Sequence, residues 1–279
     1  MFVTDRLIYL QMHKTGCTHI EYLLSKYIGG KKIGKHNWLQ NYDTEKHIIG
    51  SIRNPWDWYV SLWAFGCKKK GNIYNVLTHR FIIFPFFLLS KFRHILGFKE
   101  PYFSISDIST HFKNEIKKPI KMWKKTYEDS SDPNCFRNWL KSLYDPQRII
   151  DLQSGFHESS ISKFAGLMTY RYCRFYLKDF FIPQNFKGIK KLEELKDFDK
   201  SNNLLHYMIK TENLEEDLID TLEKIGYKLD NATIESIRNS GKTNISKHYS
   251  TSFYYDEETI KLVSEKEKFI IEKFGYSPP

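Results

Sequence analysis

The feature that most constrains the fold is a change of hydrophobic periodicity within residues 6–28. Residues 6–12, RLIYLQM, are apolar enough for a short buried strand. After the turn HKTG, apolar residues recur at the spacing of one helical face, at Ile20, Leu23, Leu24, Tyr27 and Ile28. We therefore expect a strand, a turn of small residues and a helix in succession, with the unpaired N–H groups of the helix start in the turn.

The turn itself has the residue types of an anion-binding loop. Backbone N–H groups over residues 15–18 can surround a phosphate, and Lys14 adds a positive charge. Gly16 lets an anion approach the backbone closely, and the hydroxyls of Thr15 and Thr18 can donate further hydrogen bonds. Lys14 precedes Gly16, however, so the G-x-x-x-x-G-K-[ST] spacing of nucleotide triphosphatases and kinases is missing. A plain helix start with a solvated lysine is the alternative.

Residues 47–65, HIIGSIRNPWDWYVSLWAF, repeat the strand-to-helix pattern. We expect a strand over residues 48–52, and Pro55 suits the first position of the following helix. Arg53 then stands at the carboxyl end of the strand and Ser61 two turns into the helix, at the sheet edge where open α/β folds bind ligands. An ion pair between Arg53 and a local carboxylate is the alternative.

Length, charge and cysteine content narrow the class of protein. A chain of 279 residues can bury a sizeable core. Its formal charge of +10 favours anionic ligands, whether nucleic acid, nucleotide, acidic sugar or membrane surface. The four cysteines are far apart and form no C-x-x-C pair, which indicates neither a zinc site nor a disulfide framework. With no secretory signal before the first strand, we expect a soluble, cytoplasmic protein without a metal.

The most apolar window is FIIFPFFLLS, residues 81–90. It is far shorter than the roughly 20 residues that a helix needs to cross a bilayer, and Pro85 interrupts it. We expect no transmembrane segment and interpret the window as a buried part of an inserted region. An acceptor groove or a peripheral membrane contact is the alternative.

The motifs HKTGCTH and RNPWDWYVSL, with their strands about 35 residues apart, together resemble the sulfotransferases that use 3′-phosphoadenosine 5′-phosphosulfate. The likeness is greatest to the carbohydrate-modifying and bacterial branches. Residues 206–227 resemble that family's later strand and helix, and residues 244–276 its C-terminal segment. The resemblance implies an α/β, P-loop-like three-layer fold, with a central mainly parallel sheet flanked by helices, as one domain over residues 1–279. Residues 66–204 match no pattern and are expected to form a largely helical insertion that serves as an acceptor-binding cap.

The resemblance also implies roles for single residues. The family's first loop binds the 5′-phosphosulfate, which gives this role to Lys14, Thr15, Gly16, Cys17 and Thr18. The arginine of the second motif and the serine eight residues later bind the 3′-phosphate, and these are Arg53 and Ser61 here. Cys17 stands where Gly or Ser is more usual, so only its backbone N–H is assigned.

A loop near the C-terminus, SGKTNISKHY, is the third element with an implied role. In related enzymes a loop in this place closes over the nucleotide, which assigns contacts with the 3′-phosphate to Lys242 and Lys247. A solvated basic loop is the alternative. The helix expected after it, over residues 256–273, has Asp256 as its N-cap and is explained by packing.

Sulfuryl transfer to a hydroxyl needs a cation beside the leaving group and a base for the hydroxyl proton. Lys14 is predicted to be the cation. His36, in GKHNWLQNY, is predicted to be the base, because relatives that sulfate sugar 6-hydroxyls have a similar His-x-x-Trp element there. His13 is the alternative base, although a role in shaping the loop suits it better. If His36 is the base and has the unperturbed histidine pKa of about 6.5, the acidic limb of the rate profile should lie near pH 6.5.

The expected function is therefore a sulfotransferase with 3′-phosphoadenosine 5′-phosphosulfate as co-substrate, no metal, and a hydroxylated acceptor such as a carbohydrate or glycolipid. A kinase-like phosphoryl transferase on a related fold is one alternative, weakened by the missing Walker spacing. A basic nucleic-acid-binding protein is another, but the Lys and Arg residues are dispersed and no RNA or DNA module is visible.

Overall fold

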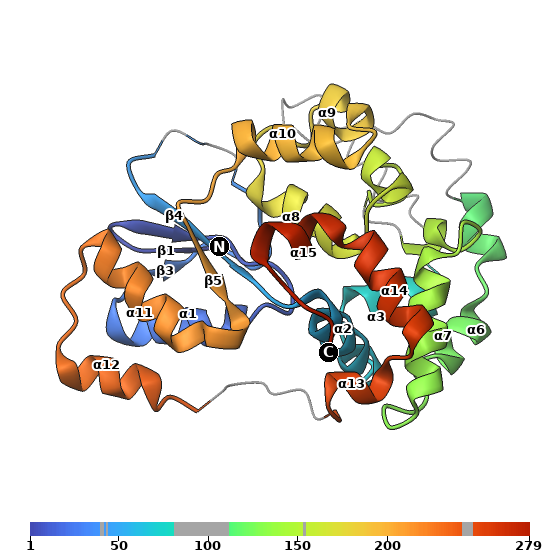
Figure 1. Ribbon diagram of the computed structural model, residues 1–279, viewed down its shortest axis with the longest axis horizontal. Coiled ribbons are helices and arrows are strands. Elements are labelled where there is room, and N and C mark those ends of the chain that lie inside the picture. The colour runs from blue at the N-terminus through green and yellow to red at the C-terminus, as the bar shows by residue number, and fades with distance from the viewer. Residues whose placement is uncertain (40–41, 43, 81–111, 153–154, 242–247) are drawn as a thin grey trace.

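The computed structural model describes residues 1–39, 42, 44–80, 112–152, 155–241 and 248–279 (Figure 1). The apolar window 81–90, Lys242 and Lys247 lie outside the described residues, so the expectations that concern them stay predictions. No helix in the described ranges is long and apolar enough to span a membrane.

A mixed five-stranded sheet forms one half of the molecule, in the strand order β3-β1-β2-β4-β5. The strands are β1 (Phe2–Val3), β2 (Leu7–Tyr9), β3 (Lys31–Lys32), β4 (His47–Ile52) and β5 (Tyr207–Lys210). β2, β4 and β5 pair in parallel, whereas β1 pairs antiparallel with both β2 and β3. The expected mainly parallel sheet is thus correct for β2 and β4, which carry the two motifs, and for β5, and it is wrong for the edge formed by β1 and β3, which makes the sheet mixed.

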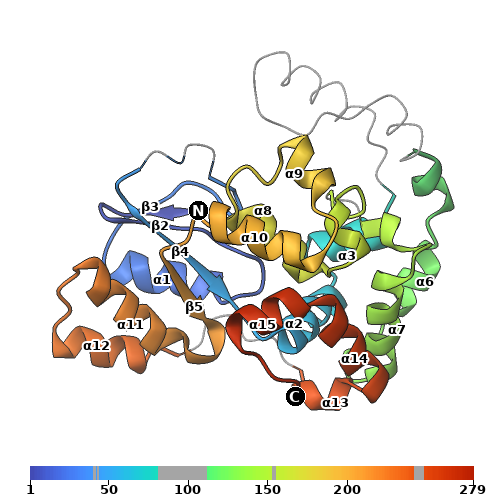
Figure 2. The same ribbon diagram turned by 45° about the horizontal axis from the view of Figure 1, so that its top comes forward.

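Helices cover both faces of this sheet (Figures 1 and 2). On one face, Tyr9, Ile49 and Ile209 pack with buried residues of α1 (Cys17–Tyr27) and α11 (Leu214–Ile225). On the other face, Ile8 and Ile48 belong to a larger core with α8 (Leu167–Tyr176). The alternation along β2 and β4 therefore sends successive side chains into different cores, as the period of a strand requires.

The two sequence motifs fold as predicted at the level of secondary structure. β2 leads through a loop into α1, and β4 leads through Arg53 and Asn54 into α2 (Pro55–Cys67). The Asn54 side chain accepts a hydrogen bond of 3.0 Å from the N–H of Trp56, and Pro55 occupies the first turn. Both turns end at the same edge of the sheet because β2 and β4 are parallel neighbours.

In the described part of residues 66–204 the regular elements are helical. They are α3 (Asn72–Thr78), α6 (Ile120–Lys125), α7 (Pro133–Tyr144), the short 3₁₀ turns Ile149–Leu152 and Ser160–Lys163, α8, α9 (Pro183–Gly188) and α10 (Leu192–Asn202). Trp123 and Trp139 from this region share one buried core with Trp63 of α2. The largely helical character expected of the insertion is confirmed for its described residues, and these helices pack onto the second motif.

The C-terminal part returns to the sheet and then covers the insertion. After β5 come the 3₁₀ turn Thr211–Asn213, α11, α12 (Asn231–Arg238), α13 (Thr251–Tyr254), α14 (Glu257–Lys266) and α15 (Lys268–Phe274). Asp256 caps α14 in a capping box with Thr259, as predicted.

The single helix expected over residues 256–273 is wrong, because the chain breaks at Glu267. Glu267 is fully buried and its carboxylate accepts hydrogen bonds from the N–H groups of Met168, at 3.0 Å, and Thr169, at 2.8 Å. These N–H groups belong to the first turn of α8, where an acceptor is needed. The break thus lets the C-terminal segment cap a helix of the insertion.

Candidate functional site

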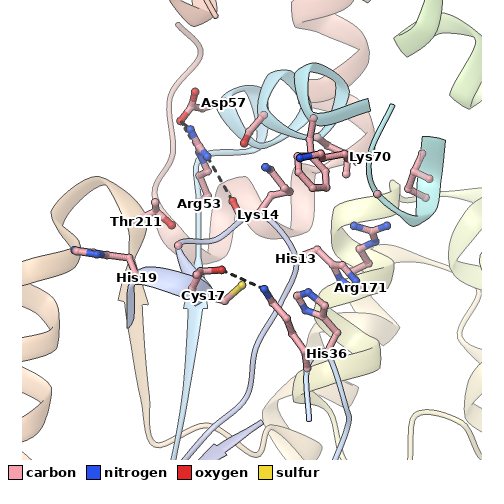
Figure 3. Close-up of a pocket in the computed structure, with 18 of the residues that line it drawn as sticks. His13, Lys14, Cys17, His19, His36, Arg53, Asp57, Lys70, Arg171 and Thr211 are labelled. Atoms are coloured by element: carbon pink, nitrogen blue, oxygen red, sulfur yellow. Dashed lines mark hydrogen bonds and ion pairs between the residues drawn. The ribbon is translucent and has the colours of Figure 1, made fainter. Parts of the chain in front are cut away.

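A cavity of about 700 Å³ opens at the carboxyl ends of β2 and β4 (Figure 3). The loop after β2, Arg53, α2, α8 and the start of α11 all contribute to its wall. Both sequence motifs therefore meet at one site, and the insertion supplies a further wall from α8. We call the part formed by the two motifs the donor side, and the part formed by α8 the insertion wall.

The loop between β2 and α1 is held from within by Thr15. Its hydroxyl donates to the carbonyl of Met12 at 2.9 Å and shares a hydrogen bond of 2.8 Å with the hydroxyl of Ser51 in β4. Thr15 is fully buried and does not line the cavity. The structure therefore does not bring the Thr15 side chain to the predicted phosphate position, and the residue fixes the loop against the sheet instead.

Two residues of this loop have left-handed backbone conformations. Lys14 has φ 64° and Gly16 has φ 75°. A Cβ atom on Gly16 would lie 2.6 Å from Cδ1 of Leu214, so a larger residue would clash as well as be strained. Strain of this kind persists where the surrounding structure determines the backbone, and it is frequent at binding sites.

Gly16 also leaves the start of α1 open to a ligand. It is the N-cap residue, it offers no side-chain acceptor, and the first turn of α1 contains no acidic residue. Cys17 and Thr18 follow it and line the cavity. Burial raises the pKa of the Cys17 thiol, which keeps the thiol neutral at pH 7 and agrees with a backbone role. The positive end of the helix thus faces the cavity without a protein carboxylate of its own turn.

Lys14 is a half-buried cation of the donor side. Its Nζ lies 4.4 Å from the centre of the Phe65 ring. Burial, with a smaller contribution from the nearby Arg53 guanidinium, lowers the pKa of Lys14 to about 8. Within the part of the chain that the structure describes, no ion pair joins Lys14 to a carboxylate. An anion bound in the cavity would raise the pKa of Lys14 again, because it would favour the charged form of the side chain.

Arg53 forms the ion pair with a local carboxylate that the sequence left open as the alternative to a ligand. Its Nε donates to Oδ2 of Asp57 at 2.6 Å, and its Nη1 lies 3.5 Å from the carbonyl oxygen of Lys14. Thr251 in turn donates to the other oxygen of Asp57 at 2.8 Å. The guanidinium is thus oriented by the protein while it lines the cavity, as does Ser61 one turn after Asp57.

His13 and His36 form a stacked pair, with ring centres 3.6 Å apart and planes 14° apart. The Nδ1 atom of His36 lies 2.9 Å from the carbonyl oxygen of Gln11. A carbonyl only accepts, so Nδ1 carries the proton, and the Nε2 of a neutral His36 keeps its lone pair. Burial lowers the pKa of His36 to about 4, well below the value of about 6.5 assumed from the sequence.

His13 is also neutral at pH 7, since burial and the neighbouring Arg171 guanidinium lower its pKa strongly. Its Nδ1 is buried and has no hydrogen-bond partner among the described residues. Its carbonyl oxygen accepts a hydrogen bond of 2.7 Å from Nε1 of Trp58. His13 therefore fixes the loop to α2 through its backbone and offers its ring to the cavity.

The cavity contains cations that the sequence motifs did not indicate. They are Lys35, Lys68, Lys70 and Arg171. Lys35 donates to the hydroxyl of Thr18 at 3.1 Å. Arg171 lies in the stretch LMTYRYCRFYL, whose aromatic residues indicate a buried helix. An arginine inside a stretch expected to be buried could have indicated a ligand-binding residue, because a buried arginine normally needs a partner.

Three further titratable residues in or near the resembling segments have protein partners or lie away from the cavity. Glu212 accepts a hydrogen bond of 2.6 Å from the N–H of Asn54, which ties the start of α11 to the second motif. His19 lies 3.2 Å from a carboxylate oxygen of Glu215. His47 begins β4 and does not line the cavity. Within the described ranges no group of three His, Cys, Asp or Glu side chains is arranged to hold a metal.

The charge of the cavity wall is positive. Six of its residues are Lys or Arg, and three carry carboxylates. The carboxylates of Asp57, Glu212 and Glu215 each have a protein partner. The wall therefore suits a ligand with more than one negative group.

Comparison of the chain with protein-family models, with curated proteins and with solved structures gives no significant match. The resemblance described above thus depends on the motifs themselves.

Proposed function

We propose that the protein is a sulfotransferase on a P-loop-like three-layer fold. It would transfer a sulfuryl group from 3′-phosphoadenosine 5′-phosphosulfate to a hydroxyl of a carbohydrate or glycolipid. The observation that carries the proposal is the meeting of the two sequence motifs, each with a cationic side chain and hydrogen-bond donors, at one cavity. The loop of Lys14 is one and Arg53 with Ser61 is the other, and Arg53 Nη1 lies 3.5 Å from the Lys14 carbonyl oxygen.

A nucleotide with phosphate groups at both ends of its ribose fits this arrangement. The N–H groups of residues 16–18 and Lys14 would bind the 5′ group, and Arg53 and Ser61 the 3′-phosphate. A volume of about 700 Å³ falls within the range of about 300–1,000 Å³ that is usual for small-molecule sites.

The chemistry is a single displacement at sulfur. The acceptor oxygen forms a bond to sulfur while the bond from sulfur to the bridging oxygen of the 5′-phosphate breaks, giving a sulfate ester and adenosine 3′,5′-bisphosphate. The ammonium of Lys14 stabilises the negative charge that grows on the bridging oxygen. Nε2 of His36 accepts the proton of the acceptor hydroxyl, with Nδ1 held by Gln11.

Calorimetry with adenosine 3′,5′-bisphosphate and with ATP tests the donor assignment. We expect micromolar or tighter binding of the bisphosphate and at least 100-fold weaker binding of ATP, because ATP lacks the 3′-phosphate for Arg53. Preference for ATP would overturn the proposal in favour of a phosphoryl transferase. Binding of neither nucleotide, with a strongly salt-dependent shift of DNA or RNA, would favour a nucleic-acid-binding protein instead.

A further inference from the structure

Arg171 is a buried cation on the insertion wall. It is 7% exposed and lines the cavity, and its Nη1 is buried without a hydrogen-bond partner among the described residues. No carboxylate among the described residues forms an ion pair with Arg171. Its guanidinium lies over the face of Trp58, whose ring centre is 5.4 Å from the guanidinium carbon. A buried guanidinium normally has a carboxylate or carbonyl partner, and the described part of the chain supplies none to Arg171.

The position of Arg171 is nevertheless fixed. α8 is capped by the buried carboxylate of Glu267, and the flanking Met168 and Tyr172 are fully buried in the core. The helix therefore presents the guanidinium to the cavity from a rigid element. A preformed cation without a counter-charge is what an anion-binding subsite requires.

The subsite belongs to the acceptor because of what surrounds it. In Figure 3, Arg171 lies beside His13 and His36, and Lys14 is drawn between this group and Arg53. The electrostatic contacts of the two arginines divide in the same way. Arg171 lowers the pKa values of His13 and His36, and Arg53 lowers that of Lys14, whereas Lys35 acts on all three residues. A group held by Arg171 therefore lies next to the proposed base, which is where the acceptor hydroxyl has to be.

We propose that the acceptor is a sugar acid, with a carboxylate close to the hydroxyl that receives the sulfuryl group, and that Arg171 binds this carboxylate. The inference rests on the proposed sulfotransferase function. The planar fork of a guanidinium matches a carboxylate through two parallel hydrogen bonds, which a lysine ammonium cannot reproduce. His13, whose Nδ1 has no protein partner among the described residues, lies at the same subsite and can donate a further hydrogen bond.

The test compares two acceptors that differ in one group. One is an oligosaccharide that contains glucuronic acid, and the other is its carboxyl-reduced form with glucose in the same linkage. Binding of each is measured by calorimetry without nucleotide and with adenosine 3′,5′-bisphosphate, and sulfation by transfer from labelled donor. The variants are Arg171→Met, Arg171→Lys and the matched control Arg174→Met, which removes a charge from the same helix outside the cavity wall.

For the wild type we expect tighter binding of the acidic oligosaccharide by about 10- to 100-fold, the range for a hydrogen bond to a charged group. Arg171→Met should abolish this preference for the acidic oligosaccharide and leave the Kd of the bisphosphate within twofold. Arg171→Lys should retain part of the preference, and Arg174→Met should retain all of it. Equal binding of the two oligosaccharides by wild type would overturn the sugar-acid inference while bisphosphate binding upholds the donor assignment. A loss of bisphosphate affinity in Arg171→Met would move Arg171 to the donor side. Failure to bind the bisphosphate would overturn the proposed function alone, since the nucleotide-free titrations still test the subsite.

Discussion

The donor side and the insertion wall each present an arginine to the same cavity, but the two are held in different ways. Arg53 is oriented by Asp57, which is itself held by Thr251. Arg171 has no such partner among the described residues and is positioned by the packing of α8 and by the face of Trp58. The charge of Arg53 is thus compensated without a ligand, whereas the charge of Arg171 depends on a ligand for compensation. We infer that the donor side is built for one invariant ligand and the insertion wall for the part that confers selectivity.

The largest effect should come from the charge at the centre of the donor side. Lys14→Ala is expected to lower kcat by about 100- to 1,000-fold, because the positive charge stabilises the leaving group as it forms. The affinity for adenosine 3′,5′-bisphosphate should fall much less. Initial rates with labelled donor and calorimetry separate the two quantities. A near-normal kcat with lost donor affinity would make Lys14 a binding residue only.

The histidine pair lies where the two regions meet and is the next largest test. His36→Ala should retain donor affinity and lose about 100-fold in kcat. In the free wild-type enzyme the acidic limb should lie near the lowered pKa of about 4, since the rate falls as a proton occupies Nε2 below that pH. A bound polyanion should raise the pKa of His36, and an NMR titration of the imidazole with and without bisphosphate measures the shift.

His13→Ala is the control for that experiment. Damage to the loop should weaken nucleotide binding rather than turnover, because the His13 carbonyl joins the loop to Trp58. If His13→Ala showed the kcat defect and His36→Ala remained active with an intact acidic limb, the base would be His13.

Removal of the compensated arginine should mainly affect donor binding. Arg53→Ala is expected to raise the Kd of adenosine 3′,5′-bisphosphate about 30-fold, equivalent to about 2 kcal/mol for a lost charge-assisted contact. Arg238→Ala is the matched control, since Arg238 pairs with Glu216 at 2.7 Å outside the cavity wall. An unchanged Kd in folded Arg53→Ala would remove Arg53 from the 3′-phosphate site.

A smaller effect concerns pH and again separates the regions. Lys14 loses its proton above a pKa of about 8 in the free protein, and a bound anion raises that pKa. Bisphosphate affinity should therefore change little between about pH 6.5 and 7.5, where most of Lys14 is charged, and be about tenfold weaker at pH 9, where about a tenth of free Lys14 is charged. Lys14→Met should bind weakly at both pH values, with no such decline. Equal decline in the variant would place the titrating group elsewhere.

The smallest effect is on stability, and its sign differs between the two arginines. Arg171→Met should raise the melting temperature of the ligand-free protein by about 2–4 °C per kcal/mol gained, because an uncompensated buried charge is replaced by apolar packing. Arg53→Met should lower it, since Asp57 loses its partner. Calorimetric scans of both variants measure the difference. A fall for Arg171→Met would show that the protein already compensates this charge.

Local signals in the sequence predicted the parts of the site that local interactions determine. Asn54 and Pro55 start α2 through contacts within three residues, and both strand-to-helix turns were placed correctly for this reason. The burial of Thr15 depends on Ser51, a partner 36 residues away, and the unpaired state of Arg171 depends on the whole insertion. The break at Glu267 places its carboxylate against the first turn of α8, about 98 residues earlier in the chain. The edge strands β1 and β3 have two residues each, which is too short for a periodic signal.

The cap that Glu267 provides for α8 has a consequence for the order in which the protein is made. β2, β4 and β5 are complete once the ribosome has passed residue 210, so the parallel part of the sheet can pair early. The N–H groups of Met168 and Thr169 receive their acceptor only after residue 267 has been synthesised. Chains halted between these two points would hold the parallel strands beside an α8 that lacks its cap. We therefore expect these strands to pair before the start of α8 is stabilised, in agreement with the tendency of chains to fold from the N-terminus.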